Sequence, residues 1–215
     1  MYRTTGVGVL DRVVAILDAV EHTPMGASDV AHHLGLSVPT AHRLVASMVA
    51  HGLLRRDAQG RHHHGRRFAV SRLSAMADPF LADLSRTTGE SAQLWVLRGE
   101  HRVCLASADS ASELRASLPV GTALALSEKG SAAQVLAGAS TEDAEPSWVE
   151  SVSRRTPGLC SVSTAVRLRG EVIAALCLAA PVSRVGEQGP GRLYGDVLLA
   201  TAERIERALD VQDRP

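Results

Sequence analysis

A chain of 215 residues, 45% of them hydrophobic, is long enough for two domains of ordinary size or one large one. It has no run of about 18 apolar residues that could span a membrane, and its N-terminus lacks the pattern of a signal peptide. Its three cysteines have neither CxxC nor Cys/His ligand spacing, which argues against a disulfide framework or a zinc site. We therefore expect a cytoplasmic protein with reduced thiols and no bound metal or cofactor.

The net charge is zero overall but unevenly distributed. Residues 1–80 contain nine arginines and six acidic residues, a net charge of +3, whereas residues 81–215 contain 14 basic and 17 acidic residues, a net charge of −3. Eight of the nine histidines also lie in the first part. A basic first part and an acidic second part are typical of a nucleic-acid-binding module joined to a domain with another task.

The chain begins with a helical pattern. Apolar residues recur at spacings of one, three and four between Val9 and Val20, which predicts an amphipathic helix. A second and shorter helix is expected at residues 29–34, because Ser28 can cap its start and Gly35 can end it.

A third helix is expected from Val38 to His51. Ser37 can cap this helix, and Pro39 falls in its first turn, where a missing N–H costs no hydrogen bond. Apolar side chains recur at i, i+3, i+4 and i+7, which marks one face of the helix as buried. These side chains are Ala41, Leu44, Val45 and Met48.

A basic hairpin is predicted after the third helix. Residues 53–56 and 61–70 have the character of strands and flank the turn Asp57-Ala58-Gln59-Gly60. The order helix, helix-turn-helix, hairpin is that of a winged helix-turn-helix domain. The basic side chains suit a wing that lies on DNA phosphates or in a minor groove. They are Arg55, Arg56, Arg61, His62, His63, His64, Arg66 and Arg67.

The start of the third helix is the candidate DNA-reading segment, since the second helix of a helix-turn-helix enters the major groove. Arg43 can donate to guanine O6 and N7 or to a phosphate, and Thr40 can contact a thymine methyl group or a phosphate. The other interpretation is an ordinary three-helix core with a solvated polar face. The predicted DNA-binding residues are Ser37, Val38, Pro39, Thr40, His42, Arg43, Ser47, Arg61, His62, His64 and Arg66.

The histidine triplet at residues 62–64 also suggests a metal site. Adjacent residues on a strand point to opposite faces, and no cysteine or carboxylate cluster joins them. We therefore expect His62 and His64 to share the DNA-facing side of the wing instead.

The second part of the chain is predicted to be an α+β domain. A helical linker interrupted at Pro79 is followed by strands at residues 92–97 and 103–108, a helix at 130–136, strands at 161–168 and 172–179, and a final helix at 192–209. Hairpins without regular strand–helix alternation are typical of this class. The expected domains are residues 1–70, which bind DNA, a linker helix of residues 71–84, and a second domain of residues 85–215.

Segments in both parts resemble the IclR family of bacterial regulators. In the first part they are Gly8-Val9-Leu10-Asp11, Pro39-Thr40-Ala41-His42-Arg43-Leu44, Gly52-Leu53-Leu54 and the Gly60-Arg61 turn. In the second part they are Thr88-Gly89-Glu90-Ser91-Ala92-Gln93-Leu94, Leu118-Pro119-Val120-Gly121, Gly130-Ser131-Ala132-Ala133-Gln134 and Ser161-Val162-Ser163. Within the family the chain is most similar to actinobacterial regulators of amino-acid biosynthesis, leucine biosynthesis in particular.

The resemblance implies a winged helix-turn-helix domain joined by a short helical linker to a GAF-like α/β effector-binding domain. It also implies a homodimer, often assembled further to a tetramer, that binds a dyad-symmetric operator in double-stranded DNA. The expected effector is a small amino acid or carboxylate. The residues implied for its pocket are Leu118, Leu124, Gly130, Ser131, Glu150, Cys160, Cys177 and Ala179.

These pocket assignments have simpler alternatives. Cys177 alternates with leucines and can be a small buried hydrophobe, the segment 130–131 can cap a helix, and Glu150 can be a solvated surface charge. The chain is also shorter than typical members of the family before residue 88 and between residues 136 and 159. We therefore expect an abbreviated linker helix, and either a smaller or more open pocket or no working pocket.

An enzymatic function has little support in the sequence. It contains no Gly-x-Ser-x-Gly, His-Glu-x-x-His or Walker motif. The alternative function is a thiol-based redox sensor or reductase, which would need Cys104, Cys160 or Cys177 to be exposed with a lowered pKa. The apolar neighbours of these cysteines favour inert burial.

Overall fold

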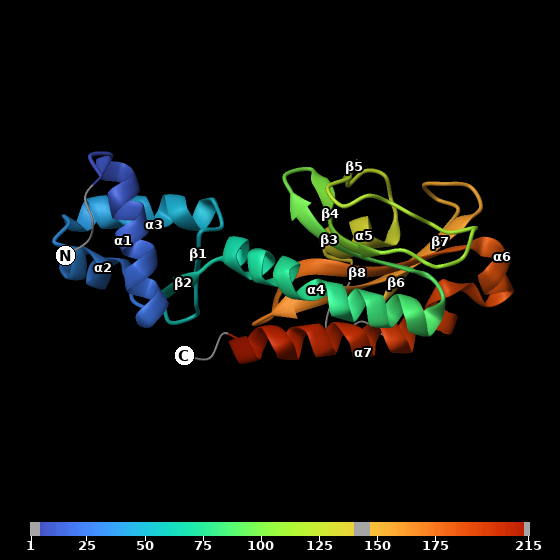
Figure 1. Ribbon diagram of the computed structural model, residues 1–215. Helices are drawn as coiled ribbons and strands as arrows, with labels where there is room; N and C mark the ends of the chain where they lie inside the picture. The colour runs from blue at the N-terminus through green and yellow to red at the C-terminus, as the bar shows by residue number, and fades with distance from the viewer. Residues whose placement is uncertain (1–4, 140–146, 213–215) are drawn as a thin grey trace. The chain divides into compact units, whose positions relative to one another are not determined.

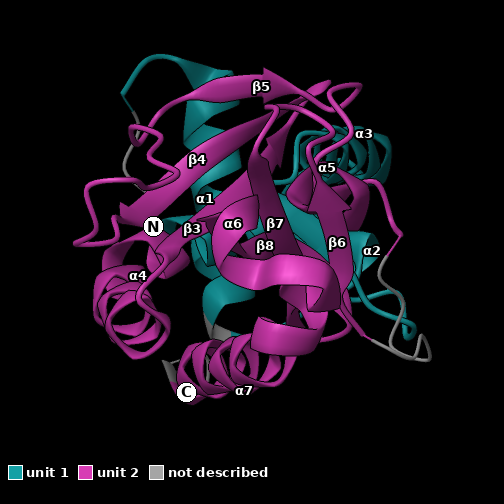
Figure 2. Cartoon of the chain, turned by 90° about the vertical axis from the view of Figure 1, so that its right-hand side faces the viewer, with its two compact units in different colours: residues 1–71, 215 teal, residues 72–214 magenta. Residues whose placement is uncertain are grey.

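A computed structural model of the chain describes residues 5–139 and 147–212 (Figure 1). The chain forms two compact units that divide between Ser71 and Arg72 (Figure 2). Neither described segment contains a helix that is long and apolar enough to cross a membrane.

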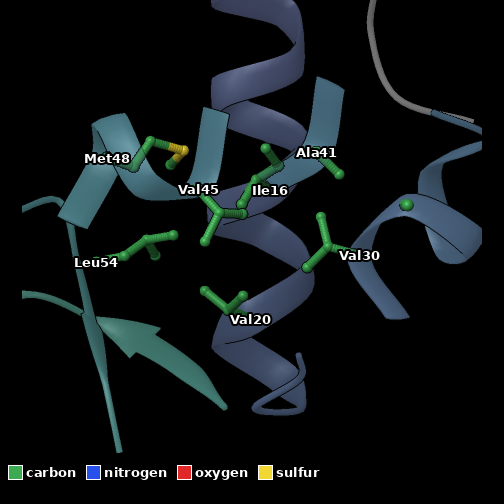
Figure 3. Close-up of a cluster of buried hydrophobic side chains, with 8 residues drawn as sticks. Ile16, Val20, Val30, Ala41, Val45, Met48 and Leu54 are labelled. Carbon is green, nitrogen blue, oxygen red and sulfur yellow. The ribbon is translucent and has the colours of Figure 1, made fainter. Parts of the chain in front are cut away.

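The first unit contains three helices and a hairpin. The helices are α1 (Gly8–His22), α2 (Ala27–Leu34) and α3 (Val38–Ala50), and the strands are β1 (Leu54–Arg56) and β2 (His62–His64). One apolar cluster joins them, with side chains from every helix and from β1 pointing toward a common centre (Figure 3). Its labelled members are Ile16, Val20, Val30, Ala41, Val45, Met48 and Leu54. The predicted order of helices and hairpin is confirmed.

Two local predictions in this unit are wrong. Helix α2 starts after Gly26 rather than Ser28, because the Asp29 carboxylate accepts the Gly26 N–H at 3.1 Å and stabilises an earlier start. The second strand does not extend to residue 70, because a Cβ on Gly65 would lie 2.8 Å from the Leu54 carbonyl oxygen. Only glycine permits this close approach, which ends the strand at His64.

Helix α4 (Arg66–Thr88) begins directly after this glycine. Apolar residues at helical spacing are buried along it, namely Ala69, Val70, Leu73, Ala77, Leu81 and Leu84. The expected interruption at Pro79 is wrong, since the helix continues through this exposed residue. The helix extends the linker expected at residues 71–84 by five residues at its start and four at its end.

The second unit is built on a six-stranded antiparallel sheet, which confirms the α+β prediction. In spatial order the strands are β5 (Ala123–Ala125), β4 (His101–Ala108), β3 (Ser91–Arg98), β8 (Glu171–Pro181), β7 (Leu159–Leu168) and β6 (Val149–Val152). The two predicted hairpins, β3–β4 and β7–β8, lie side by side through β3 and β8. Strands β5 and β6 were not predicted, because three or four residues are too few for an alternating pattern to stand out.

Helices cover both faces of the sheet. Helices α4 and α7 (Gly189–Gln212) lie on one face, and α5 (Ser131–Leu136) lies on the other (Figures 1 and 2). A short helix, α6 (Val182–Val185), and a 3₁₀ turn (Gly186–Gln188) lead from β8 into α7. The α5 face contains a second apolar cluster formed by Trp95, Cys104, Ala132, Val135, Ala165, Ala175 and Cys177.

Strand β6 is fixed to the start of α7. Gly191 and Gly195, one turn apart, make room for the Trp148 ring, since a Cβ on Gly195 would lie 2.5 Å from the indole Nε1. The Gly191 N–H also donates to the Glu150 carboxylate at 3.0 Å. The side chain of Glu150 therefore lies on the face of the sheet that α7 covers and contacts the start of that helix.

An ion pair with a buried carboxylate links the residue before β3 to α6. The Glu90 side chain, 2% exposed, accepts hydrogen bonds from Arg184 Nε at 2.6 Å and Nη2 at 2.7 Å. Arg184 Nη2 also donates to the Leu114 carbonyl oxygen at 2.9 Å, and the Tyr194 hydroxyl lies 3.3 Å from the same carboxylate. This network fixes the long connection after β4 to the end of the sheet.

Candidate DNA interface and effector pocket

Helix α3 presents a polar face on the side opposite its buried residues. Ala41, Val45 and Met48 pack into the core. Six of the predicted DNA-binding residues are exposed on α3 or at its cap: Ser37, Val38, Pro39, His42, Arg43 and Ser47. Thr40 is half-buried, and its hydroxyl lies 2.8 Å from that of Ser37. The first turns of α3 therefore offer hydroxyl, imidazole and guanidinium groups to a partner.

A groove of about 610 Å3 lies beside this face. Residues of α2, α3 and the hairpin line it, among them Ser28, His42, Arg56 and Gly60. The Ser28 hydroxyl lies 3.4 Å from the His42 ring. Asp29 also lines the groove, and its carboxylate already accepts the Gly26 N–H at the start of α2. The cationic groups of the groove therefore come from α3 and the hairpin rather than from the start of α2.

Asp57 organises the tip of the hairpin. Its carboxylate accepts the Gln59 N–H at 3.0 Å and the Arg61 N–H at 2.8 Å. It also pairs with Arg61 Nε at 3.0 Å and His63 Nε2 at 2.9 Å. These contacts, that of His63 above all, hold the pKa of Asp57 well below its usual range. Arg61 stays 52% exposed, so it can still face a phosphate.

The expectation that His62 and His64 share a DNA-facing side is corrected. His62 is 5% exposed and its Nδ1 lies 3.2 Å from the Met25 carbonyl oxygen, which ties the hairpin to residue 25. His64 stacks on Phe68 at 4.5 Å and contacts the Leu17 carbonyl oxygen at 3.2 Å. Both rings therefore hold the hairpin to the helices, although an edge of His62 still lines the groove beside α3. Burial lowers the pKa of His62. Arg66 remains exposed, but on the first turn of α4.

A pocket lies in the second unit, on the face of the sheet that α5 covers. Its cavity volume is about 50 Å3, against roughly 300–1,000 Å3 for common small-molecule sites. Five residues expected from the family resemblance line it, namely Leu118, Gly130, Ser131, Cys160 and Cys177. The Ser131 hydroxyl lies 2.7 Å from both Ser161 and Ser163, so α5 is anchored to β7 at the base of the pocket.

Three other expected residues do not line this pocket. Glu150 bonds to the start of α7, and its neighbour Ser151 takes the pocket position, because successive residues of a strand face opposite sides. Leu124 packs against the apolar cluster of the α5 face. Ala179 lies two residues after Cys177 on the same side of β8. It is paired with Ser91 of β3 and with Ser161 of β7.

The sequence reasoning missed the polar part of the pocket. The missed lining residues include Gln93, Trp95, Arg102, Arg154, Arg155 and Thr156. In the structure, buried residues alternate with more exposed ones along β4, and Arg102 occupies a buried position on the same side of the strand as Cys104. Charged residues are rarely buried without a partner, so an inward arginine marks a candidate site.

Arg102 is packed against an aromatic ring. Its guanidinium lies 5.3 Å from the centre of the Trp95 ring, and the Trp95 Nε1 donates to Gln93 Oε1 at 3.2 Å. Gly130 gives the guanidinium its space, because a Cβ there would lie 2.9 Å from Nη1. Burial lowers the pKa of Arg102, which remains charged as arginines in proteins do.

The three cysteines are buried thiols without a disulfide. Burial raises the pKa of Cys104 and of Cys160 to about 11 and also raises that of Cys177. At pH 8 a thiol with a pKa of about 11 is thiolate in roughly one molecule in a thousand. These environments oppose thiol chemistry. Among the described residues no group of three or more His, Cys, Asp or Glu could hold a metal.

We expect the thiols of the native protein to be inert toward a disulfide reagent at pH 8. All three should react once the protein is unfolded in guanidinium chloride, because the thiolate is the reactive form and burial disfavours it. Absorbance of the released chromophore counts the reacted thiols in each state. One rapidly reacting thiol in the folded protein would restore the redox hypothesis.

Comparisons with known proteins agree with this geometry. The model of the IclR helix-turn-helix domain matches residues 9–58, and that of the bacterial transcriptional regulator IclR C-terminal domain matches residues 69–156. The HTH-type transcriptional regulator BhcR of Paracoccus denitrificans is 26% identical over 240 residues, which cover 92% of this chain and 86% of that protein.

Solved structures share the fold. A regulator of the IclR family from Rhodococcus sp. has a TM-score of 0.60 and 24% identity, over 95% of this chain and 94% of that one. An IclR homolog from Microbacterium hydrocarbonoxydans, complexed with 4-hydroxybenzoate, has a TM-score of 0.55 and 24% identity, over 94% and 99% of the two chains. The names of the Paracoccus and Rhodococcus proteins both describe transcriptional regulators.

The family models, the exposed polar face of α3 and the pocket beside α5 give one consistent assignment. The chain belongs to the IclR family of transcriptional regulators, which combine a helix-turn-helix DNA-binding domain with a C-terminal domain that binds a small-molecule effector.

Proposed function

We propose that this regulator acts in the cytoplasm as a homodimer that places two copies of α3 in successive major grooves of a dyad-symmetric operator. The observation that carries the proposal is the exposed α3 face with Arg43 and His42, next to a groove that continues to the basic hairpin. Two-fold symmetry of the protein requires two half-sites in the DNA. The hairpin then contacts the flanking backbone through Arg61, and Arg66 lies close behind it in the chain.

An apolar stripe on α1 supports dimerisation through the DNA-binding domains. Val7, Leu10 and Val14 follow one another at helical spacing and are 50%, 58% and 53% exposed. Val9, beside them, is 56% exposed. Contiguous exposed apolar residues mark protein interfaces, and the equivalent helix of a second copy is the partner we propose. Two such dimers can assemble to a tetramer.

The pocket in the second unit is the proposed effector site. Its small volume suits a small amino acid or carboxylate. The Microbacterium homolog, which is complexed with 4-hydroxybenzoate, offers a precedent for a carboxylate. To change operator affinity tenfold, the effector must favour one DNA-binding state of the dimer by about 1.4 kcal/mol. Genes of amino-acid biosynthesis, leucine biosynthesis among them, are the proposed targets.

The proposal is tested by fluorescence anisotropy of the full-length protein on DNA from its own upstream region and on a scrambled duplex. We expect tighter binding to the natural sequence. The logarithm of the association constant should fall linearly with the logarithm of the salt concentration. The slope should be about −0.9 for each phosphate contacted. The measurement is made at two salt concentrations, and equal affinity for the two duplexes at both of them would contradict an operator in this region. An absence of binding to either duplex would contradict the DNA-binding proposal.

A further inference from the structure

Arg102 is a buried cation with unused hydrogen-bond donors. The residue is 3% exposed, and its Nε and Nη1 have no acceptor among the described residues. The indole of Trp95 faces the guanidinium but offers only its π-face. The Glu128 carboxylate acts on Arg102 only through its charge and forms no hydrogen bond with Nε or Nη1. A buried charge is unfavourable unless it is both paired and hydrogen-bonded, so Arg102 is a candidate partner for an anion.

Gln93 adds a further unused donor to the same pocket. Its side chain is 2% exposed, and its Oε1 accepts the Trp95 N–H. Because an indole can only donate, this contact identifies the amide oxygen and leaves Nε2 as a donor. Nε2 has no acceptor among the described residues. Two neighbouring strands therefore contribute residues with unsatisfied N–H groups to the lining of one cavity.

The rest of the lining has the same electrostatic character. Arg154 and Arg155 stand at the exposed side of the pocket, and Ser131, Ser161 and Thr156 supply hydroxyl groups. No aspartate or glutamate occurs among the described residues that line it. A pocket with three arginines and no carboxylate attracts an anion and offers no counter-charge to an ammonium group.

We propose that Arg102 and Gln93 bind the carboxylate of the effector, and that the effector is a small carboxylate without an amino group. The inference rests on the proposed effector function and selects between the two ligand classes named there. The carboxylate accepts hydrogen bonds from Arg102 and from Gln93 Nε2, which satisfies the orphaned donors. The cavity of about 50 Å3 limits the ligand to a few non-hydrogen atoms unless the pocket widens on binding.

The test uses acetate, lactate and pyruvate as probes, each paired with its uncharged amide, together with alanine as the amino analogue of pyruvate. Thermal unfolding of the full-length protein is followed at millimolar concentrations of each probe. We expect at least one carboxylate to raise Tm by several degrees, as a ligand bound only by the folded state does. The amides and alanine should leave Tm unchanged.

Arg102→Met separates ligand binding from a structural role. Because the substitution removes a buried charge that lacks a partner, the unliganded variant should have an unchanged or higher Tm, whereas loss of a structural arginine would lower it. The affinity for the carboxylate should fall about 100-fold. Arg192→Met is the matched control, since Arg192 is exposed on α7 and does not line the pocket; its response should equal that of the wild type.

The proposal is overturned if no carboxylate stabilises the wild type, if an amide or alanine stabilises it equally, or if Arg102→Met keeps the response. Anisotropy on operator DNA, measured on the same preparations, is independent of these outcomes. Operator binding without any carboxylate response would leave the DNA-binding function standing and remove only the ligand assignment.

Discussion

Replacement of Arg184 by methionine is expected to lower the free energy of unfolding of the second unit by about 3 kcal/mol, the low end of the range for removal of one partner from a buried ion pair. Glu90 is 2% exposed and loses both of its guanidinium hydrogen bonds, while Arg184 itself is 32% exposed. The remaining Tyr194 hydroxyl at 3.3 Å cannot replace them. Urea unfolding followed by circular dichroism measures the change.

Arg204→Met is the matched control for this experiment. Arg204 pairs with Asp83 at 2.8 Å, but the two side chains are 48% and 33% exposed. Pairs in contact with water contribute about 0–1 kcal/mol, so this variant should lose no more than that. Equal losses in the two variants would show that burial of the Glu90 carboxylate has no special cost.

Long elements with a clear period could be predicted from the sequence. The buried residues of α3 recur at i, i+3, i+4 and i+7, and both long hairpins are marked by Gly99 and Gly170 in their turns, at φ values of 58° and 81°. In these segments the local pattern and the tertiary packing favour the same structure. The winged helix-turn-helix order and the α+β class followed from them.

The boundary between β2 and α4 could not be predicted, because it depends on contact between residues that are distant in the sequence. Gly65 packs against the backbone of Gly52 and Leu54, and this contact ends the strand. A pattern of apolar residues contains no information about such an approach. The same limit applies to Glu150, whose side of β6 is set by α7, more than thirty residues later in the chain.

The polar half of the pocket was missed for a related reason. The family resemblance directed attention to segments with recurring residues, whereas Arg102 lies in none of them. Its inward position becomes visible only when β4 is paired with β3 and the alternation of burial is known. The histidines of the hairpin illustrate the converse problem. The sequence analysis expected His62 on the DNA-facing side of the wing, whereas its ring is buried and contacts the carbonyl oxygen of residue 25.

Replacement of Arg43 by alanine is expected to weaken operator binding by roughly 1–3 kcal/mol if the side chain contacts guanine. Arg43 is exposed on the first turns of α3, on the polar side of the helix. Because its side chain lies outside the apolar cluster of the first unit, the variant should unfold at the wild-type temperature. Anisotropy on operator and scrambled duplexes measures the affinity, and equal affinity of variant and wild type would remove Arg43 from the interface.

Arg43→Lys distinguishes base contact from phosphate contact. A lysine can satisfy a phosphate as a point charge but cannot reproduce the planar fork that binds guanine O6 and N7. If Arg43 contacts a base, both variants lose the preference for the operator while the alanine variant keeps the salt slope of the wild type. If Arg43 contacts a phosphate, lysine restores binding, alanine weakens binding to both duplexes, and the slope of log affinity against log salt falls by about 1. The two variants therefore assign the contact even before the operator sequence is known in detail.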